Sequence, residues 1–139
     1  MARVDIFTPF YKKEERYSDV SMGFEKNPLT GNIARVTDAQ SIKQALKSLL
    51  LTDQGERLYN VNLGSKIKSS LFDPLDEITA GNLNTSIRQA ISNYEPRVEV
   101  IQLQITPSEE LNAFKVNLFF SIINIPEVQQ LDLTLKRVR

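Results

Sequence analysis

The sequence contains no cysteine, no histidine and no tryptophan. Without cysteine, disulfides, thiolate metal sites and thiol nucleophiles are excluded. Without histidine, the commonest general base and the commonest metal ligand in proteins are missing. We therefore expect no catalytic residue, no cofactor site and no metal site in this chain.

Net charge is also absent, because 17 lysine and arginine residues balance 17 aspartate and glutamate residues. No overall electrostatic field would draw the chain to nucleic acid or to an anionic membrane, so we expect neither as a partner. Neutrality removes the repulsion that keeps free monomers apart, which suits a protein inside an assembly. No apolar run approaches the roughly 20 residues that cross a bilayer, and the N-terminus lacks the apolar segment of a signal peptide.

The 139 residues are enough for one domain with a core of its own. Residues 1–19 mix charged and aromatic side chains without a sustained period, so we treat them as an N-terminal arm before a domain at residues 20–139. This arm either orders on a partner or packs on its own domain. Between residues 20 and 37, two short apolar runs flank the turn sequence NPLTG, which predicts a small hairpin.

Apolar residues at helical spacing predict two long helices. The first begins at Thr37, where TDAQ has the pattern of a capping box, and ends near Leu51 or Thr52. The second spans residues 76–94, and its apolar stripe consists of Ile78, Leu83, Ile87, Ala90, Ile91 and Tyr94. A short helix is expected at residues 65–72, ended by Pro74.

Beyond residue 96 the apolar period changes to two, which is typical of strands. The first strand has a one-residue phase slip at Val100 and Ile101, which predicts a β-bulge. The second strand spans residues 113–123, and Pro126 separates it from a third that contains Leu131, Leu133 and Leu135. We therefore predict an α+β domain in which two long helices pack on one face of a three-stranded antiparallel sheet, with an N-terminal arm and a small hairpin.

The sequence NYEPRVEV marks the joint between the second helix and the strands. Proline fixes its own φ and pushes the preceding residue out of the helical region, so Glu95 and Arg97 flank a stiff corner at Pro96. The corner is either a helix stop with two solvated charges or a contact site, because a guanidinium on a rigid joint can bind a carboxylate in two places. For the contact site, we expect Arg97→Ala to leave the domain folded and to impair assembly.

Two turns punctuate residues 51–75, and their glycines are nine positions apart with no phosphate-loop pattern. We expect a structural role for the turn residues, because turn glycines with flanking charges usually stabilise their own loop. The alternative is that the two charges face a neighbouring subunit. The residues concerned are Gly55, Glu56, Arg57 and Gly64.

The last strand is expected at one edge of the sheet, where backbone N–H and C=O groups remain unpaired. Such an edge either accepts a strand from another subunit or is protected by its charges. The candidate partner-binding residues on this strand are Leu131, Asp132, Leu133, Thr134, Leu135, Lys136 and Arg137.

Taken together, these elements resemble a known family. The stretch TDAQSIKQALKSLLLTDQGERLYNVNLGSKIKSSLFDPL, followed by a helix and NYEPRVEV, contains T..GER, NLGS, LF.PL and YEPR in one order and spacing. This arrangement is similar to the small baseplate wedge proteins of contractile-tailed phages, the sheath-initiator family, which includes T-even-type wedge subunits and type VI secretion counterparts. The resemblance runs from about Asp19 to the C-terminus, so it covers the domain at residues 20–139 and leaves the arm unassigned.

The resemblance implies a structural role in the virion. Members sit in the tail baseplate, near the tail tube, with six copies per baseplate, and assemble in the host cytoplasm. The implied partners are the core bundle of the larger wedge subunits, the tail sheath protein, and tail tube or hub proteins. By the same resemblance Glu95, Pro96 and Arg97 contact the core bundle, and the strand at residues 131–137 receives extensions of the first sheath ring and nucleates its polymerisation.

Two other functions are alternatives. A lysozyme-like glycoside hydrolase of the tail needs two carboxylates about 5 to 10 Å apart across a sugar cleft, one of them with a raised pKa. No acidic residue here follows that pattern, and tryptophan for sugar stacking is missing. A soluble regulatory binding module would use the same apolar faces without a sheath partner. We expect a structural protein and no enzymatic activity.

Overall fold

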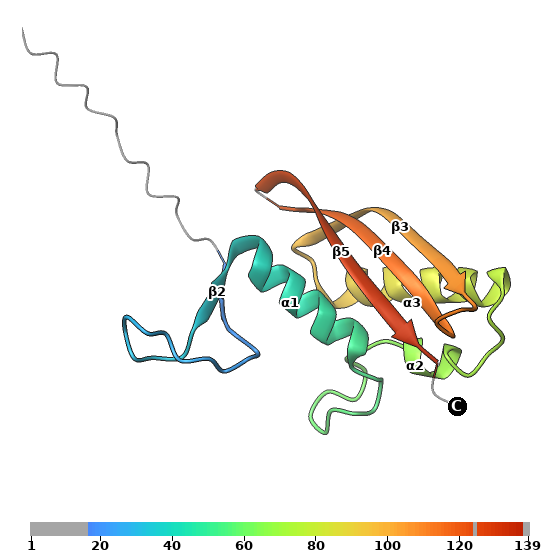
Figure 1. Ribbon diagram of the computed structural model, residues 1–139, viewed down its shortest axis with the longest axis horizontal. Coiled ribbons are helices and arrows are strands. Elements are labelled where there is room, and N and C mark those ends of the chain that lie inside the picture. Colours follow the sequence, from blue (N-terminus) through green and yellow to red (C-terminus); the bar gives the residue numbers. More distant parts are fainter. Residues whose placement is uncertain (1–16, 124, 138–139) are drawn as a thin grey trace, which may run out of the picture.

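The computed structural model describes residues 17–123 and 125–137 (Figure 1). Its elements, in chain order, are β1 (Ser18–Val20), β2 (Arg35–Thr37), α1 (Asp38–Leu51), α2 (Ile67–Ser70), α3 (Glu77–Tyr94), β3 (Val98–Ser108), β4 (Ala113–Ile122) and β5 (Ile125–Lys136). The last three strands form an antiparallel sheet in the order β3-β4-β5. The predicted α+β class and the three-stranded antiparallel sheet are confirmed.

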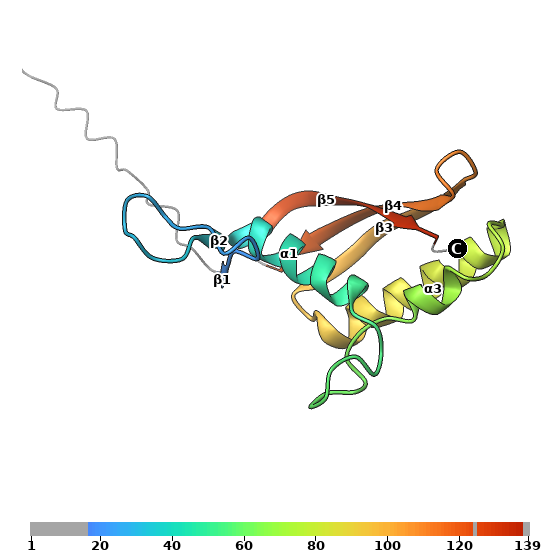
Figure 2. The same ribbon diagram turned by 60° about the horizontal axis from the view of Figure 1, so that its bottom comes forward.

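The helices lie beneath and beside this sheet. Figure 2 shows α3 under the sheet, where it packs along β3, and α1 next to it. Helix α1 contacts α2 and α3 and reaches the sheet at β5. The more specific prediction that both long helices cover one face of the sheet does not follow from these contacts alone.

One cluster of buried side chains joins the three helices to the inward faces of the three strands. Strand β4 runs through its centre, and every second residue of this strand is buried: Phe114, Val116, Leu118, Phe120 and Ile122. Helix α1 contributes Ile42, Leu46 and Leu50, as its apolar spacing predicts. The core is therefore built from the two periodicities that the sequence displays.

The start of α1 differs from the prediction. Thr37 is the N-cap residue, but its side chain makes no capping hydrogen bond, so the predicted capping box is wrong. Thr37 also belongs to β2 and pairs with Ser18 of β1, which fixes its extended backbone. At α3, in contrast, the Asp76 carboxylate accepts a hydrogen bond from the Thr79 N–H at 2.7 Å. That bond satisfies one of the donors left unpaired at a helix N-terminus.

Ile78 does not belong to the buried stripe of α3, because it is 75% exposed. Thr79 and Ala80 are buried in its place. Ile78 lies five residues before Leu83, and five residues correspond to about 500° of helical rotation, so the two side chains cannot share one face. The prediction included Ile78 because it is apolar and did not take account of its angular position around the helix axis.

The predicted bulge in β3 is confirmed, because the register with β4 shifts between Val100 and Gln102. Ile101 is the additional residue, and it is exposed. The prediction for Pro126 is wrong, because β5 begins at Ile125 and includes the proline. Pro126 lies in an irregular part of the ladder, where a residue without an N–H is tolerated.

Strands β1 and β2 form a separate two-stranded antiparallel sheet, which is the predicted hairpin. The Gln44 side chain ties it to α1, since it donates to the Val20 carbonyl at 2.8 Å and accepts from the Met22 N–H at 3.1 Å. Residues 18 and 19, assigned to the arm from sequence, belong to β1. Tyr17 of the predicted arm directly precedes β1, and residues 1–16 lie outside the described residues.

Candidate functional site

The Glu95-Pro96-Arg97 corner joins the end of α3 to the start of β3. Glu95 is the C-cap residue of the helix, and its N–H donates to the Ile91 carbonyl at 2.8 Å. The Val98 N–H donates back to the Glu95 carbonyl at 3.1 Å, which closes the turn into β3. The helix stop predicted from the proline is therefore confirmed.

The two charges of the corner pair with each other. Nε and one terminal nitrogen of Arg97 donate to the two carboxylate oxygens of Glu95 at 2.6 and 2.8 Å. Glu95 is only 6% exposed, so the guanidinium compensates a buried negative charge. These hydrogen bonds raise the pKa of the Arg97 guanidinium above its ordinary value, and burial opposes the rise.

The corner is also held from outside. The Arg97 guanidinium lies 5.4 Å from the centre of the Tyr17 ring, within the range of a cation–π contact. The Ile123 N–H donates to the Arg97 carbonyl at 3.0 Å, and the Tyr17 hydroxyl donates to the Ile123 carbonyl at 3.4 Å. Pro96 is exposed, and 38% of the Arg97 side chain stays accessible. A partner would therefore meet a rigid surface made of a proline ring and part of a guanidinium.

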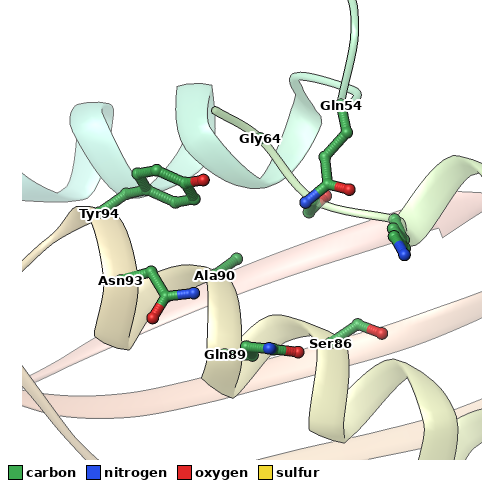
Figure 3. Close-up of a pocket in the computed structure, with 9 residues that line it drawn as sticks. Gln54, Gly64, Ser86, Gln89, Ala90, Asn93 and Tyr94 are labelled. Atoms are coloured by element: carbon green, nitrogen blue, oxygen red, sulfur yellow. The ribbon is translucent and has the colours of Figure 1, made fainter. Parts of the chain in front are cut away.

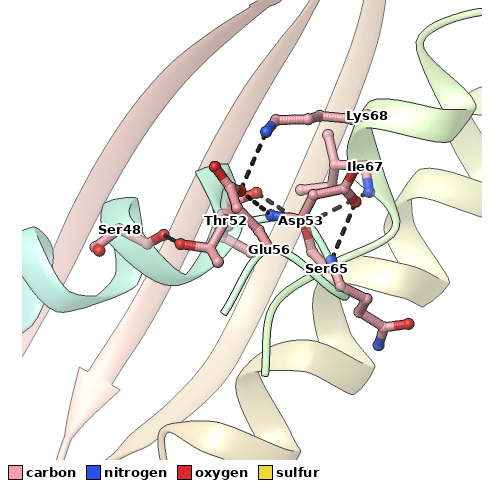
Figure 4. Close-up of polar contacts among 9 residues, drawn as sticks. Ser48, Thr52, Asp53, Glu56, Ser65, Ile67 and Lys68 are labelled. Carbon is pink, nitrogen blue, oxygen red and sulfur yellow. Dashed lines mark hydrogen bonds and ion pairs between the residues drawn. The ribbon is translucent and has the colours of Figure 1, made fainter. Parts of the chain in front are cut away.

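The loop after α1 is held by its own polar groups (Figure 4). One carboxylate oxygen of Glu56 accepts a hydrogen bond from the Asp53 N–H at 2.9 Å and lies 3.3 Å from Nζ of Lys68. The Asp53 N–H, followed by Lys68, lowers the pKa of Glu56 from its ordinary value. Glu56 thus bonds to the backbone of its own loop and to Lys68 of α2.

The two loop glycines have positive φ angles, +91° at Gly55 and +131° at Gly64. The Gly55 N–H donates to the Val61 carbonyl at 2.8 Å, which closes the turn. A Cβ atom at Gly64 would lie 2.6 Å from the Thr52 carbonyl oxygen, because the backbone approaches the end of α1 there. A side chain at residue 64 would collide with that backbone.

Between these glycines the loop exposes apolar side chains that are not among the residues predicted from the sequence to be functional. Leu58 is 90% exposed, and Tyr59 and Val61 are exposed as well. The Tyr94 hydroxyl donates to the Asn62 carbonyl, which ties this loop to the end of α3. The signal was present in the sequence as the run LYNV inside a turn-rich segment.

The structure brings the turn at Gly55-Glu56-Arg57 close to the Glu95-Pro96-Arg97 corner. Arg57 and Glu95 line one pocket of about 290 Å³, together with Asp19 and Leu63. Arg57 and Glu95 are 38 positions apart in the sequence, yet they line the same pocket. The predictions from the sequence named this turn and this corner as two separate candidate sites.

A second pocket, of about 140 Å³, lies between the loop and α3 (Figure 3). Its side chains are mainly amides and hydroxyls, and it is lined by Gln54, Gly64, Ser65, Lys66, Ser86, Gln89, Ala90, Asn93 and Tyr94. No carboxyl group is among them, so this pocket lacks the acid pair that glycoside hydrolysis requires. Within residues 17–123 and 125–137, no group of three or more acidic side chains is placed to hold a metal ion. In the same ranges, no helix is long and apolar enough to cross a membrane.

Strand β5 is an edge of the three-stranded sheet, so half of its backbone groups point away from β4. Leu131 and Leu133 face the core but are only partly buried, whereas Leu135 is buried. Asp132, Thr134 and Lys136 are exposed on the other face.

Arg137 is bound within the domain, since its N–H donates to the Asn112 carbonyl at 3.0 Å and its guanidinium to the Phe72 carbonyl at 3.1 Å. Of the candidate residues on this strand, Leu135 and Arg137 are thus committed to the domain. Residues 131–134 and Lys136 remain accessible.

Comparison with known proteins gives one family match. Residues 36–124 match the family model described as baseplate wedge protein gp25. The chain is 28% identical over 120 residues to baseplate wedge protein gp25 of Enterobacteria phage T4, which covers 86% of this chain and 90% of the relative.

Two solved structures share the fold. A putative tail lysozyme from Geobacter sulfurreducens superimposes with a TM-score of 0.69 at 19% identity, over 76% of this chain and 98% of that one. A chain of the anti-feeding prophage baseplate superimposes with a TM-score of 0.68 at 20% identity, over 79% of this chain and 88% of that one.

Proposed function

Because the chain belongs to the baseplate wedge protein gp25 family, we propose that it joins the larger wedge subunits of a contractile tail to the first ring of sheath. It is a component of the baseplate of a phage tail or a related phage-like particle. We propose that it nucleates sheath polymerisation by accepting a strand of the sheath protein on β5. We also propose six copies per baseplate; the related anti-feeding prophage baseplate is described as 6-fold symmetrised.

The observation that carries this proposal is the open edge of β5. An edge strand offers a row of N–H and C=O groups to another chain, and adding a strand satisfies them. Here the partly buried Leu131 and Leu133 would gain cover from the added strand. The buried residues of α1 and α3 belong to one cluster with all three strands, which supports our proposal that both helices back one face of the sheet. The added sheath strand would then extend this sheet beyond β5.

For the wedge contact we propose the outer surface of the Glu95-Pro96-Arg97 corner. The internal pair holds the guanidinium in place, so its accessible part and the proline ring meet a partner without losing side-chain entropy on binding. Arg57 lines the same pocket as Glu95 and is a further candidate for this contact.

Proline scanning of β5 tests the strand addition. Proline has no N–H, and in an antiparallel strand the N–H groups of alternate residues point outward. We therefore expect proline at successive residues from 130 to 134 to unfold the sheet at every second position and to leave it folded at the others. Circular dichroism and the urea midpoint identify the folded variants.

The folded proline variants should fail to capture sheath protein and to start sheath assembly, whereas alanine at the same positions should retain both. Electron microscopy of tails assembled from purified wedge, tube and sheath proteins provides the readout. Normal sheath initiation by folded proline variants would overturn the proposal.

A glycoside hydrolase function has weaker support. Glu95 is the one buried acidic residue among those described, and both of its carboxylate oxygens accept hydrogen bonds from Arg97. It is therefore poorly placed to give a proton to a glycosidic oxygen. The likeness to the Geobacter protein concerns the fold alone. Cleavage of purified cell wall by this chain, lost on substitution of a single acidic residue, would revive the alternative.

A further inference from the structure

A groove runs along the outer side of α1, between the β1–β2 hairpin and β5. Its volume is about 690 Å³. Helix α1 forms its floor, and the β5 edge contributes Leu131 to one side. Its lining also includes Met22 of the hairpin, Lys43, Lys47 and Leu51 of α1, and Glu56 of the loop that follows.

The groove is apolar at its rim and positively charged along α1. Met22, Leu51 and Leu131 supply apolar surface that is wholly or partly exposed. Lys43 and Lys47 are one helical turn apart, and neither forms an ion pair with any residue that the structure describes. Glu56, the one acidic residue of the lining, is already paired with Lys68. The unpaired charge of the groove is therefore positive.

Resting on the strand addition proposed above, we infer that this groove selects the incoming strand by its side chains. The occupant is a segment of the tail sheath protein that extends the sheet at β5 and carries an aspartate or glutamate opposite Lys43 and Lys47. Side chains of a β-strand alternate between two faces, so those on the helix side of the added strand lie over α1. Apolar residues there cover Leu131 and Leu51, and an acidic residue at the next inward position reaches the lysines.

The chemistry of the groove separates two contributions to binding. Backbone pairing on β5 can bind almost any extended chain, because backbone hydrogen bonds do not depend on the identity of the side chains. The lysine pair adds a preference for acidic segments and disfavours basic ones, since like charges brought together in an interface are repulsive. This device would keep the edge from capturing unrelated strands.

The test measures binding of purified, monomeric sheath protein of the same particle to the full chain. The combined variant Lys43→Glu/Lys47→Glu should bind about tenfold more weakly, because each attractive contact becomes repulsive. Its matched control is Arg88→Glu/Lys115→Glu, which makes the same change in net charge at exposed positions on α3 and β4. The control should change the affinity by less than about twofold.

A carbodiimide, which links an amine to a carboxylate in contact with it, should join Lys43 or Lys47 to an acidic residue of the sheath protein. Substituting that acidic residue by lysine should restore binding to the charge-reversed variant. An equal loss of affinity in the two charge-reversed variants, or no loss in either, overturns the inference.

The proline variants of β5 separate this inference from the proposal on which it rests. If folded proline variants lose binding while the lysine reversal has no effect, strand addition stands and the groove has no selective role. If the proline variants bind normally, strand addition itself is wrong, and the inference falls with it.

Discussion

At the scale of single residues, Glu95 and Arg97 determine what the corner can offer to a partner. The carboxylate is buried and faces inward to the guanidinium, so one of the two candidate charges is not free to bind. Two hydrogen bonds to Glu95 and the contact with the Tyr17 ring fix the guanidinium, and the Ile123 N–H holds the backbone of residue 97. The main role of the pair is therefore to stabilise the fold, and only the accessible part of the guanidinium is available to a partner.

We predict that Arg97→Ala destabilises the isolated domain, contrary to the expectation from sequence that it leaves the fold intact. Removing the guanidinium leaves a buried carboxylate without its partner, which costs about 1–3 kcal/mol. The double variant Glu95→Gln/Arg97→Ala should be more stable than the single one, because a neutral amide is less costly to bury than a charge. Urea unfolding measures both.

The matched control is Arg88→Ala, which removes an exposed hydrogen bond to Asn84 of 3.0 Å and should change stability by less than about 0.5 kcal/mol. Wild-type stability of Arg97→Ala would contradict this account of the pair. The double variant, once shown to be folded, is also the appropriate one for testing the proposed contact with wedge subunits.

A pair of glycines provides a second prediction at the same scale. Gly64→Ala should lower the free energy of unfolding by about 2 kcal/mol or more, because φ is +131° and the new Cβ would lie 2.6 Å from the Thr52 oxygen. Gly81→Ala should raise it by about 0.5–1 kcal/mol, since this glycine lies within α3 and its added Cβ would meet no atom within 4 Å beyond the adjacent backbone of its own helix. Equal effects of the two substitutions in urea unfolding would contradict the explanation.

At the scale of elements, the loop after α1 depends on the ionised form of Glu56. The pKa of this carboxyl is lowered from its ordinary value of 4.5, first by the Asp53 N–H and then by Lys68. A lowered pKa in the folded state means that the contribution to stability is present above the unfolded value and is lost as the pH falls through the folded value. The contacts of the loop should thus weaken only under acidic conditions.

We predict that an NMR titration of the side-chain carboxyl carbon places the pKa of Glu56 below 4.5 in the wild type. In Lys68→Gln the pKa should rise only part of the way to 4.5, because the larger cause, the Asp53 N–H, remains. Lys66→Gln is the control, since the bond to Glu56 comes from residue 68. A complete return to 4.5 in Lys68→Gln would mean that the backbone hydrogen bond contributes nothing.

Elements of this fold were predictable to different degrees. The bulge at residues 100–102 and the buried face of β4 follow from side-chain period alone, because a strand alternates strictly. The missing cap at Thr37 and the inclusion of Pro126 in β5 could not be predicted from the side-chain period. Both depend on which strand lies alongside. The pairing of Glu95 with Arg97 and the presence of Arg57 and Glu95 in one pocket likewise depend on the tertiary structure. Local spacing identified the candidate residues but could not show their partners.

At the scale of the whole molecule, the buried core and the exposed apolar side chains lie in different segments. Strand β4 is paired on both sides and supplies the centre of the core. In Figures 1 and 2 the hairpin projects beyond the N-terminal end of α1 and the loop after α1 projects from its C-terminal end. These two segments carry exposed Phe24, Leu29, Leu58 and Tyr59. Large apolar side chains left in water on such segments are typical of surfaces that are covered in an assembly.

We predict a corresponding order of amide hydrogen exchange in the isolated chain. Amides of β4 should exchange slowest, near the rate set by global unfolding, because their opening requires loss of the whole sheet. Amides of residues 21–34 and 54–63 should exchange orders of magnitude faster, since few buried contacts hold these segments. In the assembled baseplate, the same two segments and β5 should gain protection, while the exposed face of α3 provides the internal control. Slow exchange of the hairpin in the free chain, or no gain on assembly, would show that its apolar side chains serve the domain itself and not a neighbour.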